Sequence, residues 1–148
     1  MNRFLVIDQN RATAQRLGLR CLEQDIAVII AENVCEGVRT LAATPVSLIV
    51  VDAGGLRLGA REHATLFDRV APGVPVIVTV RPDVPLETRV AFELAGFRVL
   101  PEPLTTDELL KILASVEVVR AEAVPAVRGE RRRGASRSGE MIGDRGER

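Results

Sequence analysis

The sequence predicts an α/β fold in which five parallel strands alternate with five helices, a (βα)5 arrangement. Five apolar runs recur with their starts 21 to 27 residues apart, and the segments between them have helical periodicity. The runs are continuous rather than alternating and are rich in β-branched residues, which is typical of strands covered on both faces. Because crossovers between parallel strands are right-handed, such a chain is expected to form a doubly wound, three-layer sandwich with a five-stranded sheet in the order 2-1-3-4-5.

The strands are predicted at 4–7, 27–31, 48–51, 75–80 and 98–100. Capping residues precede three of the helices: Asn10 before the first, Asn33 with Glu36 before the second, and Thr105 with Glu108 before the fifth. The expected inner faces of the helices, in chain order, are Ala14, Leu17 and Cys21; Val38, Leu41 and Ala42; Leu66, Phe67 and Val70 (helix 60–70); Val90, Ala91 and Leu94 (helix 85–95); and Leu109, Ile112, Leu113, Val116 and Val119.

Charge and composition divide the chain near residue 120. Residues 1–119 carry 12 basic and 15 acidic side chains and hold nearly all large apolar residues, so they are expected to form the folded domain. Residues 120–148 are rich in Arg and Gly, carry a net charge of +3 and have few apolar side chains, which predicts a flexible tail or linker. We interpret the run 131–133 as part of a solubilising linker, with nucleic acid contacted only indirectly or through this tail.

The composition excludes several classes of protein. No apolar run approaches the roughly 20 residues of a membrane-spanning helix, and the N-terminus has no secretory signal. Two cysteines, Cys21 and Cys35, are too few for a disulfide scaffold or a thiolate zinc site and fit helix faces as small apolar residues. The single histidine, His63, is expected to be solvated on the third helix. These observations predict a cytoplasmic protein.

Polar side chains follow the predicted strands where each strand ends. Asp8 and Gln9 follow the first strand, Asp52 closes the third, Thr79 lies near the end of the fourth, and Glu102 follows the fifth. The carboxyl ends of parallel strands meet at one edge of the sheet, so these groups are expected to converge there. Neighbouring carboxylates raise each other's pKa unless a cation offsets them, and Mg²⁺ is the usual cation. Glu102 either completes a three-carboxylate cation site or is exposed to solvent.

Five segments at the predicted strand ends follow one another along the chain: Leu5-Val6-Ile7-Asp8-Gln9-Asn10, Ser47-Leu48-Ile49-Val50-Val51-Asp52, Val76-Ile77-Val78-Thr79, Leu94-Ala95-Gly96, and Val99-Leu100-Pro101-Glu102-Pro103. In this order they resemble the receiver domain of two-component response regulators, a CheY-like member of the flavodoxin-like folds, over about residues 3–118. The resemblance implies that Asp52 is the phosphoacceptor position and that Thr79 binds the phosphoryl group. It also implies that Asp8, Asp52 and the Gly54 carbonyl would hold Mg²⁺.

Two departures from that pattern bear on the expected chemistry. Gln9 stands where the family has the second acid of the first strand, and Glu102 stands where it has a lysine. Lys111 is the only lysine in the chain, so no other lysine can take that position. Phosphoryl transfer depends on neutralising the phosphoryl oxygens with a metal and a fixed ammonium. We therefore interpret the sequence as an atypical receiver, or pseudo-receiver.

The leading hypothesis is a signalling module of a phosphorelay or two-component system that is not an enzyme and acts by protein–protein contact, with no cofactor required. Its expected partners are an output domain or a cognate regulator and a second copy, paired through the face of the fourth helix, fifth strand and fifth helix. Segment 139–144 faintly resembles the start of the ATPase domain of AAA+ transcriptional activators, which implies a role in transcription regulation. The alternative is a working phosphoacceptor receiver using Asp52 and Mg²⁺. A flavin carrier or small α/β enzyme is disfavoured, because no phosphate-binding loop follows the first strand.

Overall fold

The computed structural model describes residues 2–56 and 59–115. The chain divides into two units, Met1–Leu113 and Ala114–Arg148, and the α/β fold is that of the first. The predicted domain boundary at 119, the Arg/Gly-rich tail, segments 131–133 and 139–144, and the expected inner positions 116 and 119 all lie outside the described residues. None of the described helices is long and apolar enough to cross a membrane.

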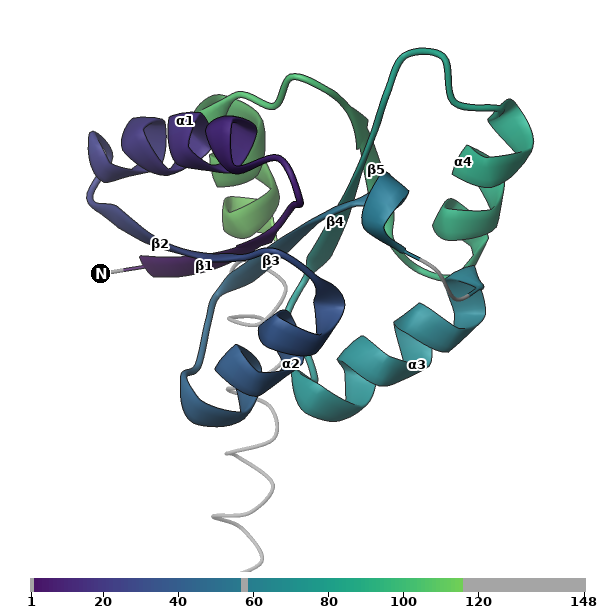
Figure 1. The fold of residues 1–148 in the computed structure, drawn as a ribbon, viewed down its shortest axis with the longest axis horizontal. Coiled ribbons are helices and arrows are strands. Elements are labelled where there is room, and N and C mark those ends of the chain that lie inside the picture. Colours follow the sequence, from purple (N-terminus) through teal and green to yellow (C-terminus); the bar gives the residue numbers. More distant parts are fainter. Residues whose placement is uncertain (1, 57–58, 116–148) are drawn as a thin grey trace, which may run out of the picture. The chain divides into compact units, whose positions relative to one another are not determined.

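The described elements alternate between strands and helices, as the sequence predicted. They are β1 (Asn2–Ile7), α1 (Arg11–Leu22), β2 (Ile26–Ala31), α2 (Val34–Ala43), β3 (Leu48–Asp52), a short 3-10 turn (Ala53–Gly55), α3 (Ala60–Val70), β4 (Val76–Val80), α4 (Leu86–Leu94), β5 (Arg98–Pro101) and a last helical segment over 106–115. The five strands form one parallel sheet in the order β2-β1-β3-β4-β5. The predicted doubly wound α/β fold is confirmed (Figure 1).

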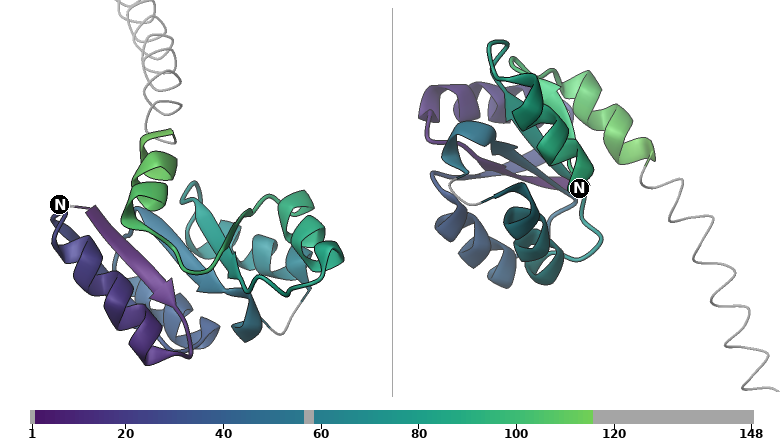
Figure 2. Two further views of the ribbon diagram at one scale, coloured as in Figure 1. Left: turned by 90° about the horizontal axis from the view of Figure 1, so that it is seen from above. Right: turned by 90° about the vertical axis from the view of Figure 1, so that its right-hand side faces the viewer.

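Helices cover both faces of the sheet, which gives three layers (Figure 2). One buried cluster joins alternate strand residues such as Phe4, Val6 and Val50 to α1 and to Leu109, Ile112 and Leu113 of the last helical segment. The other joins the intervening strand residues to α2, α3 and α4. Successive strand residues point to opposite faces, so a strand buried on both sides must be apolar at every position. This is why the apolar runs in the sequence are continuous.

The predicted caps begin the helices they were assigned to. The Asn10 side chain accepts a hydrogen bond of 3.2 Å from the Thr13 N–H, and the Asn33 side chain accepts one of 2.9 Å from the Glu36 N–H. Each satisfies a backbone donor that the first turn of a helix leaves without a partner. The first cap places α1 directly beside the end of β1, where Asp8 lies.

The expected inner face of α4 is wrong. Phe92 is the buried residue of α4, whereas Val90 and Leu94 are exposed. Phe92 packs edge-on against Phe97 with ring centroids 5.9 Å apart, and Phe97 packs against Phe67 at 6.3 Å. The aromatic side chain fills the space between helix and sheet, and this rotation of the helix turns positions 90 and 94 outward. Two smaller expectations also fail, because Ala42 and Ala91 are exposed.

Candidate functional site at the carboxyl edge of the sheet

The predicted site residues lie at one edge of the sheet. Asp8 follows β1, Asp52 ends β3, and Thr79 pairs with Asp52 in the register of β3 and β4. Glu102 follows β5, and its N–H donates a 2.9 Å hydrogen bond to the carbonyl of Val80. These four polar side chains line one pocket of about 100 Å³ beneath α1. The structure therefore brings together Asp8, Asp52, Thr79 and Glu102.

Gln9 lies apart from that pocket. It lines a separate hollow of about 610 Å³ together with residues of α2, α3 and the turn after β3, among them Cys35 and His63. The side chain that stands where receivers have their second acid is thus not among the residues lining the pocket that holds Asp8 and Asp52.

Glu102 interacts with two of the other polar residues of the pocket, Thr79 and Asp52. The Thr79 hydroxyl donates a hydrogen bond to its Oε1 at 3.4 Å. Burial raises the pKa of Glu102 above its usual value, and the nearby carboxylates of Asp52 and Asp8 raise that pKa further. Glu102 and Asp52 are also in hydrogen-bonding contact, which raises the Glu102 pKa because two carboxyl groups can share a hydrogen bond only when one is protonated. The position therefore holds a third acidic group beside Asp8 and Asp52.

Asp8 is fixed by its own backbone. The Asn10 N–H donates a 2.8 Å hydrogen bond to Asp8 Oδ1. Burial raises the pKa of Asp8, and the charge of Asp52 acts in the same direction. The hydrogen bond from Asn10 and the charge of Arg81 lower the pKa of Asp8 but do not cancel the rise.

Arg81 is a functional candidate that sequence reasoning missed. It follows β4 directly and is exposed, yet its positive charge acts on Asp8. Its place at the carboxyl end of a strand was the available signal, since functional groups of such sheets collect at that edge. A guanidinium also carries a fixed positive charge, so the lack of a second lysine does not by itself exclude a cation from this edge.

Gly54 lies against the predicted phosphoacceptor. A Cβ built on Gly54 would lie 3.2 Å from Asp52 Oδ2, closer than ordinary van der Waals contact. Residues 2–56 and 59–115 contain no cluster of three or more His, Cys, Asp or Glu side chains arranged to hold a metal ion. A three-carboxylate cation site therefore does not form from Asp8, Asp52 and Glu102 in this conformation. Asp8, Asp52 and the Gly54 carbonyl supply the oxygen atoms that Mg²⁺ prefers.

Two residues outside the pocket differ from expectation. His63 is buried rather than solvated, with 2% of its surface exposed, and it stacks on Phe67 with ring centroids 6.5 Å apart. Burial lowers the pKa of His63, and the charge of Glu62 partly opposes this. Cys21 is buried as expected, whereas Cys35 is exposed on α2. The predicted inner faces of α2 and α3 are largely confirmed, since Phe67 is buried and Leu41 and Val70 pack against the same core cluster, but the helical pattern did not place His63 among the buried residues.

Sequence comparison finds similarity to known transcriptional regulators. The chain is 30% identical over 114 residues to the transcriptional regulatory protein GlrR of Escherichia coli K12, and equally so to QseF of E. coli O157:H7. The alignment covers 74% of this chain and 25% of each relative, so the chain spans about a quarter of the length of these proteins. No protein-family model matches the chain.

Structural comparison finds receiver domains. A CheY-like receiver domain protein from Methanospirillum hungatei superposes with a TM-score of 0.69 at 21% identity, covering 83% of this chain and 99% of that one. The beryllofluoride-activated NtrC4 receiver domain dimer superposes with a TM-score of 0.67 at 19% identity, covering 78% and 96%. A response regulator protein from Burkholderia pseudomallei with a phosphorylated aspartic acid gives 0.67 at 23% identity, covering 82% and 72%. These comparisons confirm the resemblance to receiver domains and the fold that it implied.

Proposed function

We propose that this chain, which has the fold of response regulator receiver domains, is a degenerate regulatory domain of a two-component system. It acts through contacts with other proteins and does not complete the phosphorylation switch. The observation that carries this proposal is the position of Glu102, hydrogen-bonded to Thr79 and in contact with Asp52. A carboxyl group occupies the position where stabilising a phosphoryl group requires a cation.

The electrostatic argument follows from the charge of the pocket. Replacing an ammonium by a carboxylate changes the local charge by two units, and each unit at about 4 Å is worth roughly 4 kcal/mol at an effective dielectric of about 20, before screening. A phosphoryl group on Asp52 would add further negative charge between Asp8 and Glu102. Arg81 offsets this only weakly, because it is exposed and water screens its charge. Phosphorylation of Asp52 is therefore strongly disfavoured.

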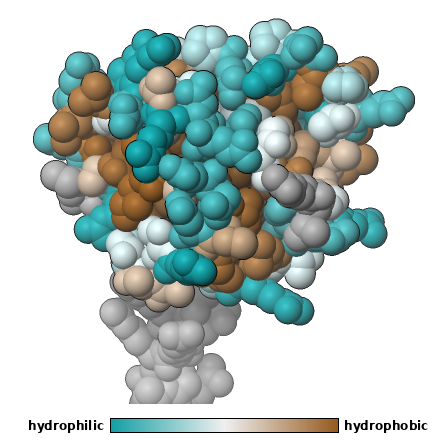
Figure 3. Space-filling model, in the orientation of Figure 1, coloured by the Kyte–Doolittle hydropathy of each residue, from teal (hydrophilic) through white to brown (hydrophobic). Residues whose placement is uncertain are grey.

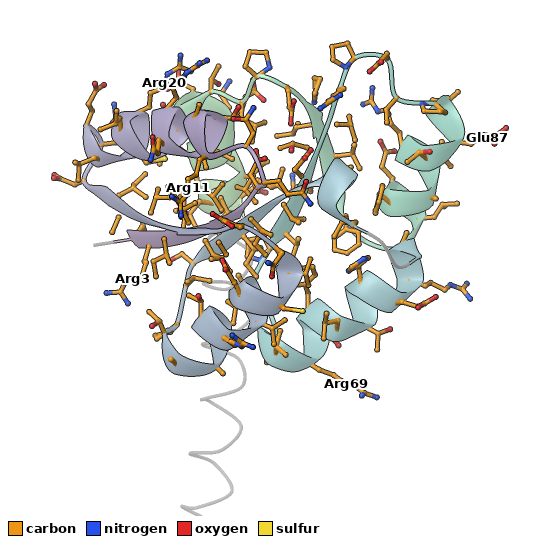
Figure 4. The ribbon with its side chains drawn as sticks, in the orientation of Figure 1. Arg3, Arg11, Arg20, Arg69 and Glu87 are labelled. Carbon is orange, nitrogen blue, oxygen red and sulfur yellow. The ribbon has the colours of Figure 1, made fainter. Side chains whose placement is uncertain are left out.

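The partner surface that we propose is the face of α4, β5 and the segment 106–115. Leu86, Val90 and Leu94 are spaced four residues apart on α4, and their exposed fractions are 74%, 41% and 84%. Residues four apart share one face of a helix, so these three form an exposed apolar stripe. Hydrophobic patches are visible in the region of α4 in Figure 3, and the Glu87 side chain beside the stripe points away from the body of the domain in Figure 4.

A second copy of this chain is the partner that this face suits best. Charges of both signs lie on α4 and on the segment 106–115, which favours symmetric pairing, because a residue of one copy can then meet an opposite charge of the other. The charged residues are Glu87, Arg89, Glu93, Asp107 and Lys111. The NtrC4 receiver domain, whose fold this chain shares, is described as a dimer. Contacts with an output domain or a cognate regulator would use the same face, and nucleic acid would be reached only through such a partner or the tail. We place the protein in the cytoplasm and assign it no enzymatic activity and no required cofactor.

The test is exposure of the whole chain to acetyl phosphate and Mg²⁺, followed by intact-mass spectrometry. The wild-type chain is expected to gain no phosphate. The double variant Gln9→Asp with Glu102→Lys restores the second acid and the ammonium, and it is expected to become phosphorylated. Adding Asp52→Asn to the double variant should abolish that gain. Stable phosphate on Asp52 of the wild-type chain would refute the degenerate function, and a folded double variant that stays inert would refute the electrostatic explanation.

The alternative function is a working phosphoacceptor receiver. Its support is the register that sets Thr79 beside Asp52, together with the close approach of Gly54 to the Asp52 carboxylate. In that case Asp8, Asp52 and the Gly54 carbonyl would hold Mg²⁺, and Glu102 would have to be neutral or move away. Rapid uptake of phosphate by the wild-type chain that depends on Mg²⁺ would establish this alternative.

A further inference from the structure

β2 lies at one end of the strand order, so one of its two sides is open. Among the described residues it pairs with β1 alone. The Asp8 N–H donates a 3.0 Å hydrogen bond to the carbonyl of Ala31, so the backbone groups of Ala31 face β1. Backbone groups alternate in direction along a strand, which turns the N–H and C=O groups of Ile26, Val28 and Ile30 toward the open side. Such an edge can pair with a further strand.

A groove of apolar side chains runs beside this edge, between β2 and α1. The helix lies directly on the strand, since a Cβ on Gly18 would be 3.7 Å from Val28. Leu19 and Leu22 of α1 line the groove with exposed fractions of 65% and 61%. The other lining residues are Gln15, Ile26, Ala27 and Ile30. Hydrophobic side chains are visible at the left of Figure 3, where α1 and β2 lie.

The charged residues at the two ends of β2 are mostly acidic. Glu23 and Asp25 precede the strand, Glu32 and Glu36 follow it in the chain, and all four are exposed. Arg11 is the basic residue beside the groove, and its guanidinium lies 3.0 Å from the Glu32 carboxylate. Each end of the edge strand therefore has an excess of negative charge.

The other arginines of α1 and β1 lie on different surfaces. Arg16 and Arg20 line the pocket that contains Asp8, on another side of α1. Arg3 alternates along β1 with Phe4, which is buried on the α1 face, so Arg3 lies on the opposite face of the sheet. Its side chain points away from the domain in Figure 4. These charges leave the acidic ends of the groove uncompensated.

We propose that the open edge of β2 and the groove beside it bind an extended segment of a partner protein, in which an alternating apolar stretch is flanked by lysine or arginine. The segment pairs with β2 as an added strand, its apolar side chains contact Leu19 and Leu22, and its basic residues lie near the acidic ends. β2 and β5 are the two opposite edges of the sheet. The site therefore goes beyond the proposed function and does not depend on the contact surface of α4.

The same charges oppose a second copy of this chain as the occupant. Antiparallel pairing of β2 with β2 of another copy would bring Asp25 of one copy toward Glu32 of the other, because these acids flank opposite ends of the strand. Like charges across paired strands are destabilising. A segment with basic flanks avoids this repulsion and is attracted at both ends.

The first experiment titrates the full chain with the peptides Lys-Lys-Val-Thr-Val-Thr-Val-Lys-Lys and Glu-Glu-Val-Thr-Val-Thr-Val-Glu-Glu and follows backbone amide shifts by NMR. The basic peptide is expected to shift the amides of β2 and to bind more tightly than the acidic peptide by about tenfold or more. Added salt should reduce this difference, because it screens exposed charges. Equal affinity for the two peptides, or shifts that leave β2 unaffected, would overturn the proposal.

The second experiment tests strand pairing. N-methylation of either the valines or the threonines of the basic peptide removes the N–H groups on one side of the extended segment only. One of these two peptides is expected to lose affinity by about tenfold or more, and the other is expected to keep it, because one row of N–H groups faces β2. Equal affinity of the two methylated peptides would refute an added strand.

Exposed leucines supply matched variants for the groove. Leu19→Ser combined with Leu22→Ser is expected to weaken binding of the basic peptide by about tenfold, because apolar contact area is lost. Leu86→Ser combined with Leu94→Ser makes the same change on α4 and should leave peptide binding unchanged. Equal loss in the two double variants would overturn the site. Self-association of the chain that the α1 double variant abolishes would assign the groove to a second copy and refute the peptide.

A charge reversal tests the acidic ends. Glu23→Lys is expected to weaken binding of the basic peptide about fivefold, since an exposed charge pair is worth up to about 1 kcal/mol. Glu62→Lys, the same change at an exposed position of α3, is its control. Unchanged affinity of the Glu23 variant would refute the requirement for basic flanks. The acetyl phosphate assay is independent of peptide binding, so failure of this proposal and failure of the proposed function are distinguishable.

Discussion

α1 and the helical segment 106–115 cover one face of the sheet with aliphatic side chains, whereas α2, α3 and α4 cover the other face around Phe67, Phe92 and Phe97. On the first face, α1 buries Ala14, Leu17 and Cys21, the residues that helical periodicity predicts. On the second face, α4 buries one aromatic side chain and exposes three large aliphatic ones, Leu86, Val90 and Leu94. A regular aliphatic stripe is therefore buried in the core on one face and exposed on the other.

The difference between the two faces shows how burial depends on the space to be filled. A helix packed closely on the sheet buries small and medium side chains along its length. A helix held by one large aromatic residue leaves its other apolar positions exposed. Leu19 and Leu22 of α1 are also exposed, because they lie on other sides of that helix than the one that buries Ala14, Leu17 and Cys21.

The largest effect is expected from removing the aromatic anchor. Phe92→Ala should lower the free energy of unfolding by about 3–5 kcal/mol, because it leaves a cavity between α4 and the sheet. Leu94→Ala, two residues away but 84% exposed, should change it by less than about 0.5 kcal/mol. Urea denaturation followed by circular dichroism measures both. Equal costs for the two variants would show that Leu94 is part of the core.

Glycine substitutions distinguish how closely the helices approach the sheet on the two faces. A Cβ on Gly37 of α2 would lie 2.5 Å from Ile7 Cδ1, so Gly37→Ala should cost about 1–3 kcal/mol in unfolding free energy. A Cβ on Gly18 of α1 would lie 3.7 Å from Val28, an ordinary contact. Gly18→Ala should stabilise the protein by about 0.5–1 kcal/mol through helix propensity. Thermal or urea unfolding measures both variants. Destabilisation by both would contradict the inference that α2 approaches the sheet more closely at Gly37 than α1 does at Gly18.

The exposed stripe of α4 is expected to control association. Leu94→Asp should raise the dimer dissociation constant at least tenfold, equivalent to about 1.4 kcal/mol, because a carboxylate would be buried at the contact. Leu19→Asp, the same change at an exposed leucine of α1, should leave association unchanged. Sedimentation velocity at several protein concentrations measures both constants. Loss of association in the α1 variant alone would show that the contact between copies lies on the other face of the sheet.

The smallest effect is a pH dependence of opposite sign on the two faces. The pKa of Glu102 is raised above 4.5 in the folded state, so the native protein binds more protons and its stability falls as pH rises through the folded pKa. The pKa of His63 is lowered below 6.5, so stability falls as pH decreases from 6.5 toward the folded value. Glu102→Gln should weaken the first dependence, and His63→Leu the second. Urea midpoints across pH 4–8 test both, and unaltered profiles would show that neither group titrates as inferred.

Much of the site could be predicted from the sequence of strands along the chain and from the residues that follow each strand. Each parallel strand delivers the residues after it to the same edge, so Asp8, Asp52, Thr79 and Glu102 had to converge once the five strands were recognised. Arg81 obeys the same rule and could have been included. The contact of Glu102 with Thr79 and Asp52 could not be predicted, because it depends on how the loop after β5 turns back over the sheet. The shape of the pocket beneath α1 also depends on the exact position of α1 over the sheet.

The sequence by itself determined the alternation of strands and helices, the strand order and the edge where the charged groups collect. These follow from local periodicity and from the handedness of crossovers, which act on every chain of this pattern. Only the tertiary structure decided that Phe92 rather than Val90 and Leu94 faces the sheet, that His63 is buried, and that Gln9 lies outside the acidic pocket. The physical reason is packing: the rotation of each helix about its axis is set by which side chains fill the volume beneath it, and that volume is formed by residues distant in the sequence.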